Sequence, residues 1–126
     1  MGEGRRKKAY KKGIFAEHAA VALLWLKGYR IRERRFKCPF GEIDIIAAKG
    51  NLIAFVEVKT RGTYEEAAES ILFSQRRRIS RAANWYIAQN SDGEPSASSY
   101  SYRFDSILLV PWNWPCHILD AWQEES

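Results

Sequence analysis

Hydrophobic and polar residues alternate between residues 41 and 60, in the stretch GEIDIIAAKGNLIAFVEVKT. This period of two predicts a pair of strands, EIDIIAA and LIAFVEVKT, joined by a turn at KGN. Upstream, YRIRERRFK also alternates and predicts a strand with one exposed face at a sheet edge. Downstream, the long apolar run in YRFDSILLV predicts a buried strand.

Two other stretches have helical periodicity. Residues 14–27 include several alanines and place four large apolar side chains near one face of a helix: Ile14, Val21, Leu24 and Trp25. Glu17 lies one turn before Val21 and so borders that face, and Gly28 is suited to end the helix. A second, longer helical pattern runs from Tyr64 to Gln89, and a polar loop, NSDGEPSASS, follows it.

The elements are therefore expected in the order helix, strand, strand, strand, helix, strand. This order predicts a single α/β domain with a mixed central sheet flanked by helices. The length of 126 residues also suits one domain. Within it, residues 1–12 are predicted to form a flexible basic arm and residues 13–126 the folded domain.

Charge and cysteine content narrow the class of protein. The net charge of +5 and the pI of about 9.4 favour a polyanionic partner such as nucleic acid, although charge alone also serves solubility. Cys38 and Cys116 form no CxxC pair, so we expect a reducing, cytoplasmic protein without a disulfide framework. The apolar run AAVALLWL is too short to span a bilayer, and we expect no membrane association.

Aromatic and histidine residues are expected to be structural. Trp25, Trp85 and Trp122 are predicted to be core residues, with base stacking as the alternative. The Trp-rich segment PWNWPCHILDAW is predicted to pack against the domain because exposed indoles are costly. His18 and His117 are isolated, which favours structural positions over metal ligation.

The predicted hairpin carries an unusual set of charged side chains. Residues two apart on a strand share a face, so Glu42 projects with Asp44, and Glu57 with Lys59. Pairing of the two strands brings Asp44 close to Glu57, where two carboxylates repel unless a cation neutralises them.

Magnesium accepts such oxygen ligands, and a lysine beside it would face the same phosphate. The hairpin thus predicts a metal-dependent phosphodiesterase site. The alternative is a polar strand face bearing a Glu–Lys pair of little energetic value, which fits poorly with the apolar context FVEVK.

Several motifs together resemble the YraN/UPF0102 family of small bacterial proteins. They are FAEHAAVALLWLKGYRI, GEIDIIAAKGNLIAFVEVKTR, RFD and HILDAW, which cover nearly the whole chain. That family is assigned to the restriction-endonuclease-like superfamily and is similar to archaeal Holliday junction resolvases. The resemblance implies a restriction-endonuclease-like fold.

The resemblance also implies roles for particular residues. Asp44, Glu57 and Lys59 match the catalytic pattern of an acid followed by acid-x-Lys on the next strand. Glu17 matches an additional acid of the resolvase-like branch, and would join Asp44, Glu57 and the Val58 carbonyl around Mg²⁺ or Mn²⁺. The alternative for Glu17 is an ordinary surface position on the helix.

Three positions depart from the family or superfamily pattern or have no assigned role in it. Ile43 stands where the superfamily pattern has proline, as is usual in this branch, and Glu42 matches the GEID motif without an assigned role. Gln75 stands where family members more often have lysine, and a glutamine at a comparable helical place assists the site in some related nucleases. Gln75 is therefore a further candidate catalytic residue.

Phosphate contacts are expected from basic residues outside the hairpin. They are Arg61, Arg76, Arg77 and Arg78, together with Lys7 and Lys8 of the arm. A solvated basic surface is the alternative.

The sequence thus predicts a metal-dependent endonuclease acting on DNA, including branched or junction DNA. A homodimer is compatible with the resemblance, since resolvases act as dimers. Two alternatives stay open: a nucleic-acid-binding module that keeps the fold without turnover, and an adaptor whose acids only form ion pairs.

Overall fold

A five-stranded mixed sheet forms the centre of the molecule. The computed structural model describes residues 15–63, 66–67, 73–91 and 100–123. The strands lie in chain order across the sheet: β1 (Arg30–Cys38), β2 (Gly41–Lys49), β3 (Leu52–Thr60), β4 (Ser101–Leu109) and β5 (Cys116–Ile118). All neighbouring strands are antiparallel except β3 and β4, which are parallel. The predicted mixed α/β domain is confirmed, and its predicted elements follow in the expected order with one further strand, β5.

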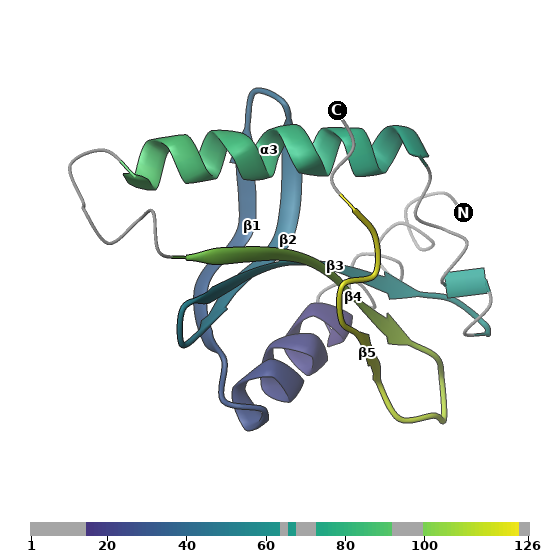
Figure 1. Ribbon diagram of the computed structural model, residues 1–126. Helices are drawn as coiled ribbons and strands as arrows, with labels where there is room; N and C mark the ends of the chain where they lie inside the picture. The colour runs from purple at the N-terminus through teal and green to yellow at the C-terminus, as the bar shows by residue number, and fades with distance from the viewer. Residues whose placement is uncertain (1–14, 64–65, 68–72, 92–99, 124–126) are drawn as a thin grey trace.

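One helix covers each face of the sheet. Helix α3 (Phe73–Ser91) connects the parallel strands β3 and β4 and packs on one face, while the helix of residues 15–26 lies on the other (Figure 1). A parallel pair requires a crossover of this kind, because its second strand must start from the same end as the first. The sequence prediction began the second helix at residue 64, and residues 64–65 and 68–72 lie outside those described.

The alternation of side chains along β2 and β3 builds a core on each face. Phe55 faces α3, where it packs with Ile79, Ala83 and Tyr86. Val56 faces the opposite way and belongs to the core beneath the helix of residues 15–26, which is completed by Ala20, Leu24, Tyr29, Ile45, Ala47, Ala54 and Ile107. Both faces of β3 are therefore covered, which fits the apolar run LIAFV at its start.

Strands β2 and β3 separate at one end. Their pairing runs from Lys49–Leu52 as far as Ile45–Val56. Beyond that point the end of the β1–β2 hairpin bends away from β3 and passes α3 (Figure 1). The amide of Val58 then donates to a side chain, Oδ2 of Asp44, at 2.8 Å. A carboxylate thus satisfies a strand amide at the point where the ladder opens.

The C-terminal segment and one helix face differ from the sequence prediction. Strand β5 was not predicted, and the hairpin that leads to it holds Trp112 and Trp114 in solvent, 103% and 89% exposed. Trp25 is also exposed, because the helix of residues 15–26 turns its small side chains, Ala16 and Ala20, toward the sheet. The prediction that these three indoles are packed is wrong. Trp122 is buried as predicted, and Trp85 is half-buried against Phe36.

Several predictions fall at or beyond the limits of the described chain. Residues 1–12, with Lys7 and Lys8, and most of the loop after α3 lie outside it.

Within the described residues, no helix combines the length and the apolar character needed to cross a membrane. Cys38 and Cys116 are both free thiols.

Candidate active site

Two acidic side chains meet where β2 and β3 separate. Continuing the register one step beyond Ile45–Val56 places Asp44 opposite Glu57, and the two carboxyl groups share a hydrogen bond. Lys59 follows on the same face of β3, with its Nζ 3.4 Å from Glu57 Oε1. From α3, Gln75 donates its Nε2 hydrogen to the same oxygen at 3.1 Å. Sequence reasoning named all four residues, and the structure brings them together.

Burial makes this pair of acids hard to ionise fully. Burial and the neighbouring Asp44 raise the pKa of Glu57 to about 8, against the opposing effect of Lys59. The pKa of Asp44 is also raised, chiefly by burial, although the Val58 amide opposes the shift. At neutral pH the pair therefore holds one proton. It stays on Glu57 and forms a hydrogen bond to the carboxylate of Asp44. Lys59 alone does not compensate for two buried negative charges.

Glu17 is buried but is held by arginines. Its Oε2 accepts a hydrogen bond from Arg35 Nε at 2.7 Å, and its Oε1 lies 3.3 Å from Arg34 Nε. Its charge still contributes to raising the pKa of Asp44. No group of three or more His, Cys, Asp or Glu side chains close enough to hold a metal occurs in the described part of the chain. The structure therefore joins Asp44 and Glu57 without bringing Glu17 into the same cluster.

Glu42, the other acid of the GEID motif, lies outside the site. Its side chain is 62% exposed and pairs with Lys37 on β1 at 3.4 Å. This surface ion pair has the same separation as Lys59–Glu57, whose side chains are only 14% and 8% exposed. The two pairs therefore differ in burial and not in distance.

Comparison with known proteins gives a family but no activity. The model of "Uncharacterised protein family UPF0102" matches residues 16–109. The chain belongs to this family. A UPF0102 protein of Parvibaculum lavamentivorans is 46% identical over 115 residues, covering 91% of this chain and 84% of the relative. Another, from Mesorhizobium japonicum, is 45% identical over 116 residues, covering 92% of this chain and 90% of the relative.

The UPF0102 match includes the residues of the carboxylate site. Glu17, Asp44, Glu57, Lys59 and Gln75 all lie within residues 16–109. The match ends before β5, so the Trp112 hairpin and His117 lie beyond it. The relatives are named only as UPF0102 proteins, so the chemistry of the site must be argued from its geometry.

One buried polar side chain beside the carboxylate pair, Ser106, was not predicted from the sequence. Ser106 on β4 is the register partner of Glu57, and its Oγ has no hydrogen-bond partner among the described residues. Arg76, a predicted phosphate contact next to Gln75 on α3, has a buried Nε that also lacks a hydrogen-bond partner among the described residues. An isolated serine gives no periodic signal, and the parallel pairing of β4 with β3 was needed to find it.

Three other predicted phosphate contacts lie on α3 or just beyond β3. Arg77 and Arg78 are exposed on α3, and Arg78 lies against Gly41 at the start of β2. Arg61 is exposed just beyond β3, with its Nη1 donating to the Thr60 carbonyl at 2.7 Å. These arginines leave their charge at the surface, as contact with a polyanion requires.

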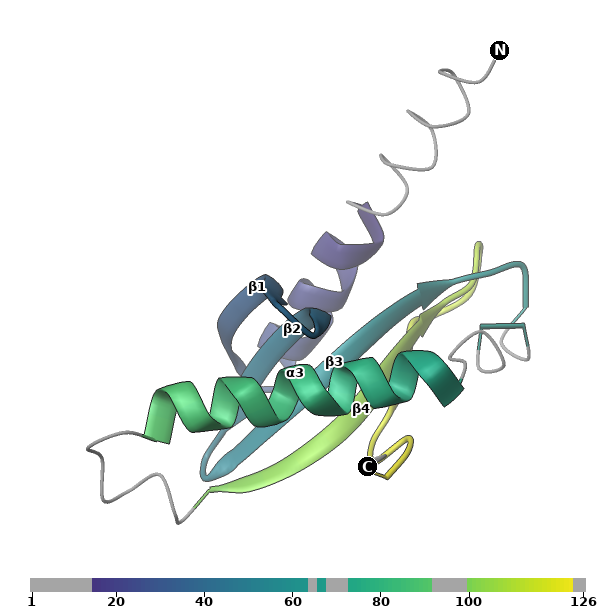
Figure 2. The ribbon, with the colours of Figure 1, turned by 90° about the horizontal axis from the view of Figure 1, so that it is seen from above.

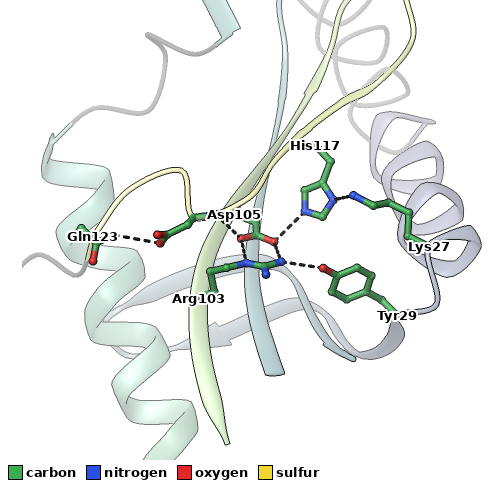
Figure 3. A network of polar contacts seen from close by, with 7 residues as sticks. Lys27, Tyr29, Arg103, Asp105, His117 and Gln123 are labelled. Atoms are coloured by element: carbon green, nitrogen blue, oxygen red, sulfur yellow. Dashed lines mark hydrogen bonds and ion pairs between the residues drawn. The ribbon is translucent and has the colours of Figure 1, made fainter. Parts of the chain in front are cut away.

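A second polar cluster lies on the opposite face of the sheet. Asp105 on β4 is fully buried and accepts hydrogen bonds from Arg103 Nε at 2.6 Å and Nη2 at 2.7 Å (Figure 3). It also accepts from His117 Nε2 at 2.9 Å and from the Asp120 amide at 3.0 Å. Arg103 Nη2 donates in turn to the hydroxyl of Tyr29 at 2.8 Å.

The partners of His117 define its protonation. Lys27 Nζ lies 2.6 Å from His117 Nδ1, and an ammonium group can only donate. Nδ1 is therefore the acceptor, and Nε2 carries the hydrogen that reaches Asp105 (Figure 3). The cluster joins the RFD and HILDAW motifs to the end of the first helix. The carboxylate of Asp105 is fully buried and its hydrogen bonds are satisfied by these partners, which indicates a structural role.

The raised pKa of Glu57 leads to a stability prediction. A group whose folded pKa of about 8 exceeds its ordinary 4.5 stabilises the fold below pH 4.5, and this contribution is lost as pH rises to 8. In chelator, wild-type stability should therefore fall over this range more than that of Glu57→Gln. At pH 8 the variant should be more stable by roughly 2–4 kcal/mol.

Urea unfolding at several pH values measures this difference. Glu42→Gln is the matched control, because Glu42 is an exposed acid on the neighbouring strand, and it should follow the wild type. Parallel stability profiles for wild type and Glu57→Gln would contradict the assignment of a buried, protonated pair.

Proposed function

We propose that this UPF0102 protein is a metal-dependent endonuclease that hydrolyses DNA phosphodiester bonds on a restriction-endonuclease-like fold. The observation that supports this proposal is the row formed by the buried Glu57 and the half-buried Asp44 and Lys59. A merely structural hairpin has no need to place beside a lysine two acids that cannot both ionise at neutral pH. The cost of that arrangement is better explained by a function that uses it.

The donor set fits a divalent cation. Asp44 and Glu57 offer carboxylate oxygens, the donors that Mg²⁺ and Mn²⁺ prefer, and a cation would replace the proton that the pair holds. The unpartnered Ser106 hydroxyl beside Glu57 is a further oxygen donor or a partner for bound water. When bound, the metal would polarise a phosphoryl oxygen and lower the pKa of a bound water.

Residues of the chain itself supply orientation and charge. Gln75 and Lys59 both fix Oε1 of Glu57, and the Val58 amide fixes Oδ2 of Asp44. Lys59 carries a positive charge in a largely water-excluded position, where it is well placed to stabilise negative charge that develops on a phosphoryl group. Glu17 would enter the metal site only if its arginine partners released it.

DNA is the proposed polyanion because basic residues neighbour members of this row along the chain. Arg76, Arg77 and Arg78 lie on the α3 turns next to Gln75, and Arg61 follows Lys59 by two residues. Lys7 and Lys8 extend the basic sequence at the N-terminal end. Branched or junction DNA as the substrate, and a homodimer as the active form, are part of the same proposal.

Manganese binding measured by calorimetry tests the site directly. We expect wild-type protein to bind the metal and Asp44→Asn to lose that binding, because one of two carboxylate donors is removed. Since a proton must leave the pair, affinity should rise with pH up to about 8. Equal binding by the wild type and Asp44→Asn would rule out this metal site.

A cleavage screen then tests the reaction. Single-stranded, duplex, flap and four-way junction DNA are each incubated with Mg²⁺ or Mn²⁺, and wild type is compared with Asp44→Asn. Cleavage of at least one DNA by the wild type alone supports the endonuclease. DNA binding without cleavage under either metal would favour the non-catalytic binding module instead.

A further inference from the structure

An outer strand of the sheet, β1, is dense in exposed positive charge. Within the described part of the chain β1 pairs only with β2, so its other side is an open sheet edge (Figure 1). Five of its nine residues are cationic and one, Glu33, is acidic. The five cations, here called the basic edge, are all exposed: Arg30, Arg32, Arg34, Arg35 and Lys37.

The composition of the basic edge suits a phosphate backbone. Charged residues on an outer strand also prevent pairing with another sheet, a role that lysine usually fills. Here four of the five cations are arginines, whose planar guanidinium groups bind phosphate oxygens in a bidentate manner. A second copy of β1 is an unsuitable partner, because pairing the two edges would bring like charges together. The open edge therefore favours a polyanion over another strand of the same kind.

The basic edge extends to the carboxylate site. The register pairs Arg34 with Ile45 and Phe36 with Ile43, which places Arg35 opposite Asp44 on β2. Neighbouring strands lie about 5 Å apart, so the edge passes within one strand spacing of Asp44. Asp44 in turn shares a hydrogen bond with Glu57 on β3. The first three strands thus present arginine, Asp44 and Glu57 in succession.

Two arginines of the basic edge already bind an oxyanion, the carboxylate of Glu17. Figure 2 shows β1 beside the first helix, from which Glu17 accepts a hydrogen bond from Arg35 Nε at 2.7 Å. Arg34 Nε lies 3.3 Å from the other carboxylate oxygen. The side chains of Arg35 and Arg34 remain 46% and 38% exposed, whereas Glu17 is buried. A phosphate oxygen arriving from solvent can therefore reach both guanidinium groups.

From these features we propose that β1 is the edge along which the protein binds the phosphate backbone of DNA, with Arg34 and Arg35 as the contacts closest to the carboxylate site. This deepens the proposed function and rests on it for the identity of the polyanion. A phosphate at these arginines competes with Glu17 for them, so DNA binding releases the Glu17 carboxylate. Arg34 and Arg35 bind DNA and take no part in the chemistry.

Fluorescence anisotropy with a labelled blunt DNA duplex, in chelator and at several salt concentrations, measures this edge without cleavage. Glu33→Gln removes the acidic residue of β1. Asp120→Asn is the matched control, because it removes an exposed acid that follows β5, at the opposite side of the sheet. Both changes raise the net charge of the protein by one.

We expect Glu33→Gln to bind the duplex roughly fivefold more tightly than wild type, the effect of one unit charge a few ångströms from a phosphate in water. Asp120→Asn should bind as wild type. Equal tightening by the two variants would show a general effect of net charge and would overturn the β1 edge.

Arg34→Gln removes a proposed contact directly. Arg35 keeps the shorter hydrogen bond to Glu17, so the buried acid stays paired and circular dichroism should show an unchanged fold. The log–log slope of affinity against salt should flatten by about 0.9, the value for one duplex phosphate contact. Arg34→Lys keeps the charge and should keep the wild-type slope.

Two further results would overturn the proposal. One is a wild-type salt slope in Arg34→Gln. The other is wild-type protein that binds no duplex at low salt, which would leave the edge to an acidic protein. Failure of the proposed function would be distinct, because the expected binding pattern without cleavage under Mg²⁺ or Mn²⁺ would refute catalysis and leave the DNA-binding edge standing.

Discussion

Replacing Lys59 by alanine should slow DNA cleavage by roughly two to three orders of magnitude. Attack of water on a phosphodiester builds negative charge on the phosphoryl oxygens, and a fixed cation stabilises that charge more in the transition state than in the ground state. Lys59 is suited to this role because its side chain is only 14% exposed, so its charge is little screened by water. DNA binding should be nearly unchanged, since the surface arginines remain.

Single-turnover cleavage at saturating enzyme measures the effect, with circular dichroism to confirm the fold. Lys37→Ala is the matched control, because Lys37 forms a Lys–Glu pair of the same length at an exposed position on β1. It should cleave at the wild-type rate. Equal cleavage by Lys59→Ala and wild type would refute the proposed role of this lysine.

The periodic parts of the sequence predicted most of the fold. The period of two in β2 and β3 and the turn between them gave the hairpin, and the long apolar run gave β4. Strand β5 has only three residues, too few to show any period. The exposure of Trp25 was also unpredictable, because either face of the first helix is apolar and only packing selects the alanine face.

The candidate site was predictable only where local pairing determines it. Asp44 lies opposite Glu57 because a short hairpin fixes the register, and Gln75 reaches them once α3 crosses β2. The contacts of Glu17 depend on tertiary structure. Arg35 reaches it from β1, where the register shifts near Glu33 and Arg35 itself adopts a φ of 53°. No pattern in the sequence of β1 indicates that irregularity.

The Asp105 cluster was also only partly predictable from the sequence. Arg103 and Asp105 share a face of β4, as residues two apart must, but Tyr29 and His117 come from distant segments. His117 was predicted to be structural, and its place between Lys27 and Asp105 gives that role a physical basis. The cluster ties β4 and β5 to the end of the first helix, and so fixes the scaffold behind the candidate site.

Replacing Asp105 by alanine should lower the stability of the protein by roughly 3–5 kcal/mol. The change leaves the half-buried guanidinium of Arg103 and the buried ring of His117 without their carboxylate, and a charge left uncompensated there is costly. Burial alone would raise the pKa of Asp105, yet the hydrogen bonds from Arg103, His117 and the Asp120 amide hold it at about 2. The ionised carboxylate therefore stabilises the fold above pH 3.8, and this contribution disappears as pH falls through 2.

Thermal unfolding at neutral pH tests this structural role, with an expected fall in midpoint of roughly 10–20 °C. Asp120→Asn is the control, because its amide and its φ of 53° are retained while an exposed charge is lost, and it should unfold close to wild type. Removing Arg103 as well, in Arg103→Met with Asp105→Leu, should restore part of the stability by eliminating the unpaired charge. If Asp105→Ala were as stable as wild type but had lost cleavage, the cluster would belong to the reaction and not to the scaffold.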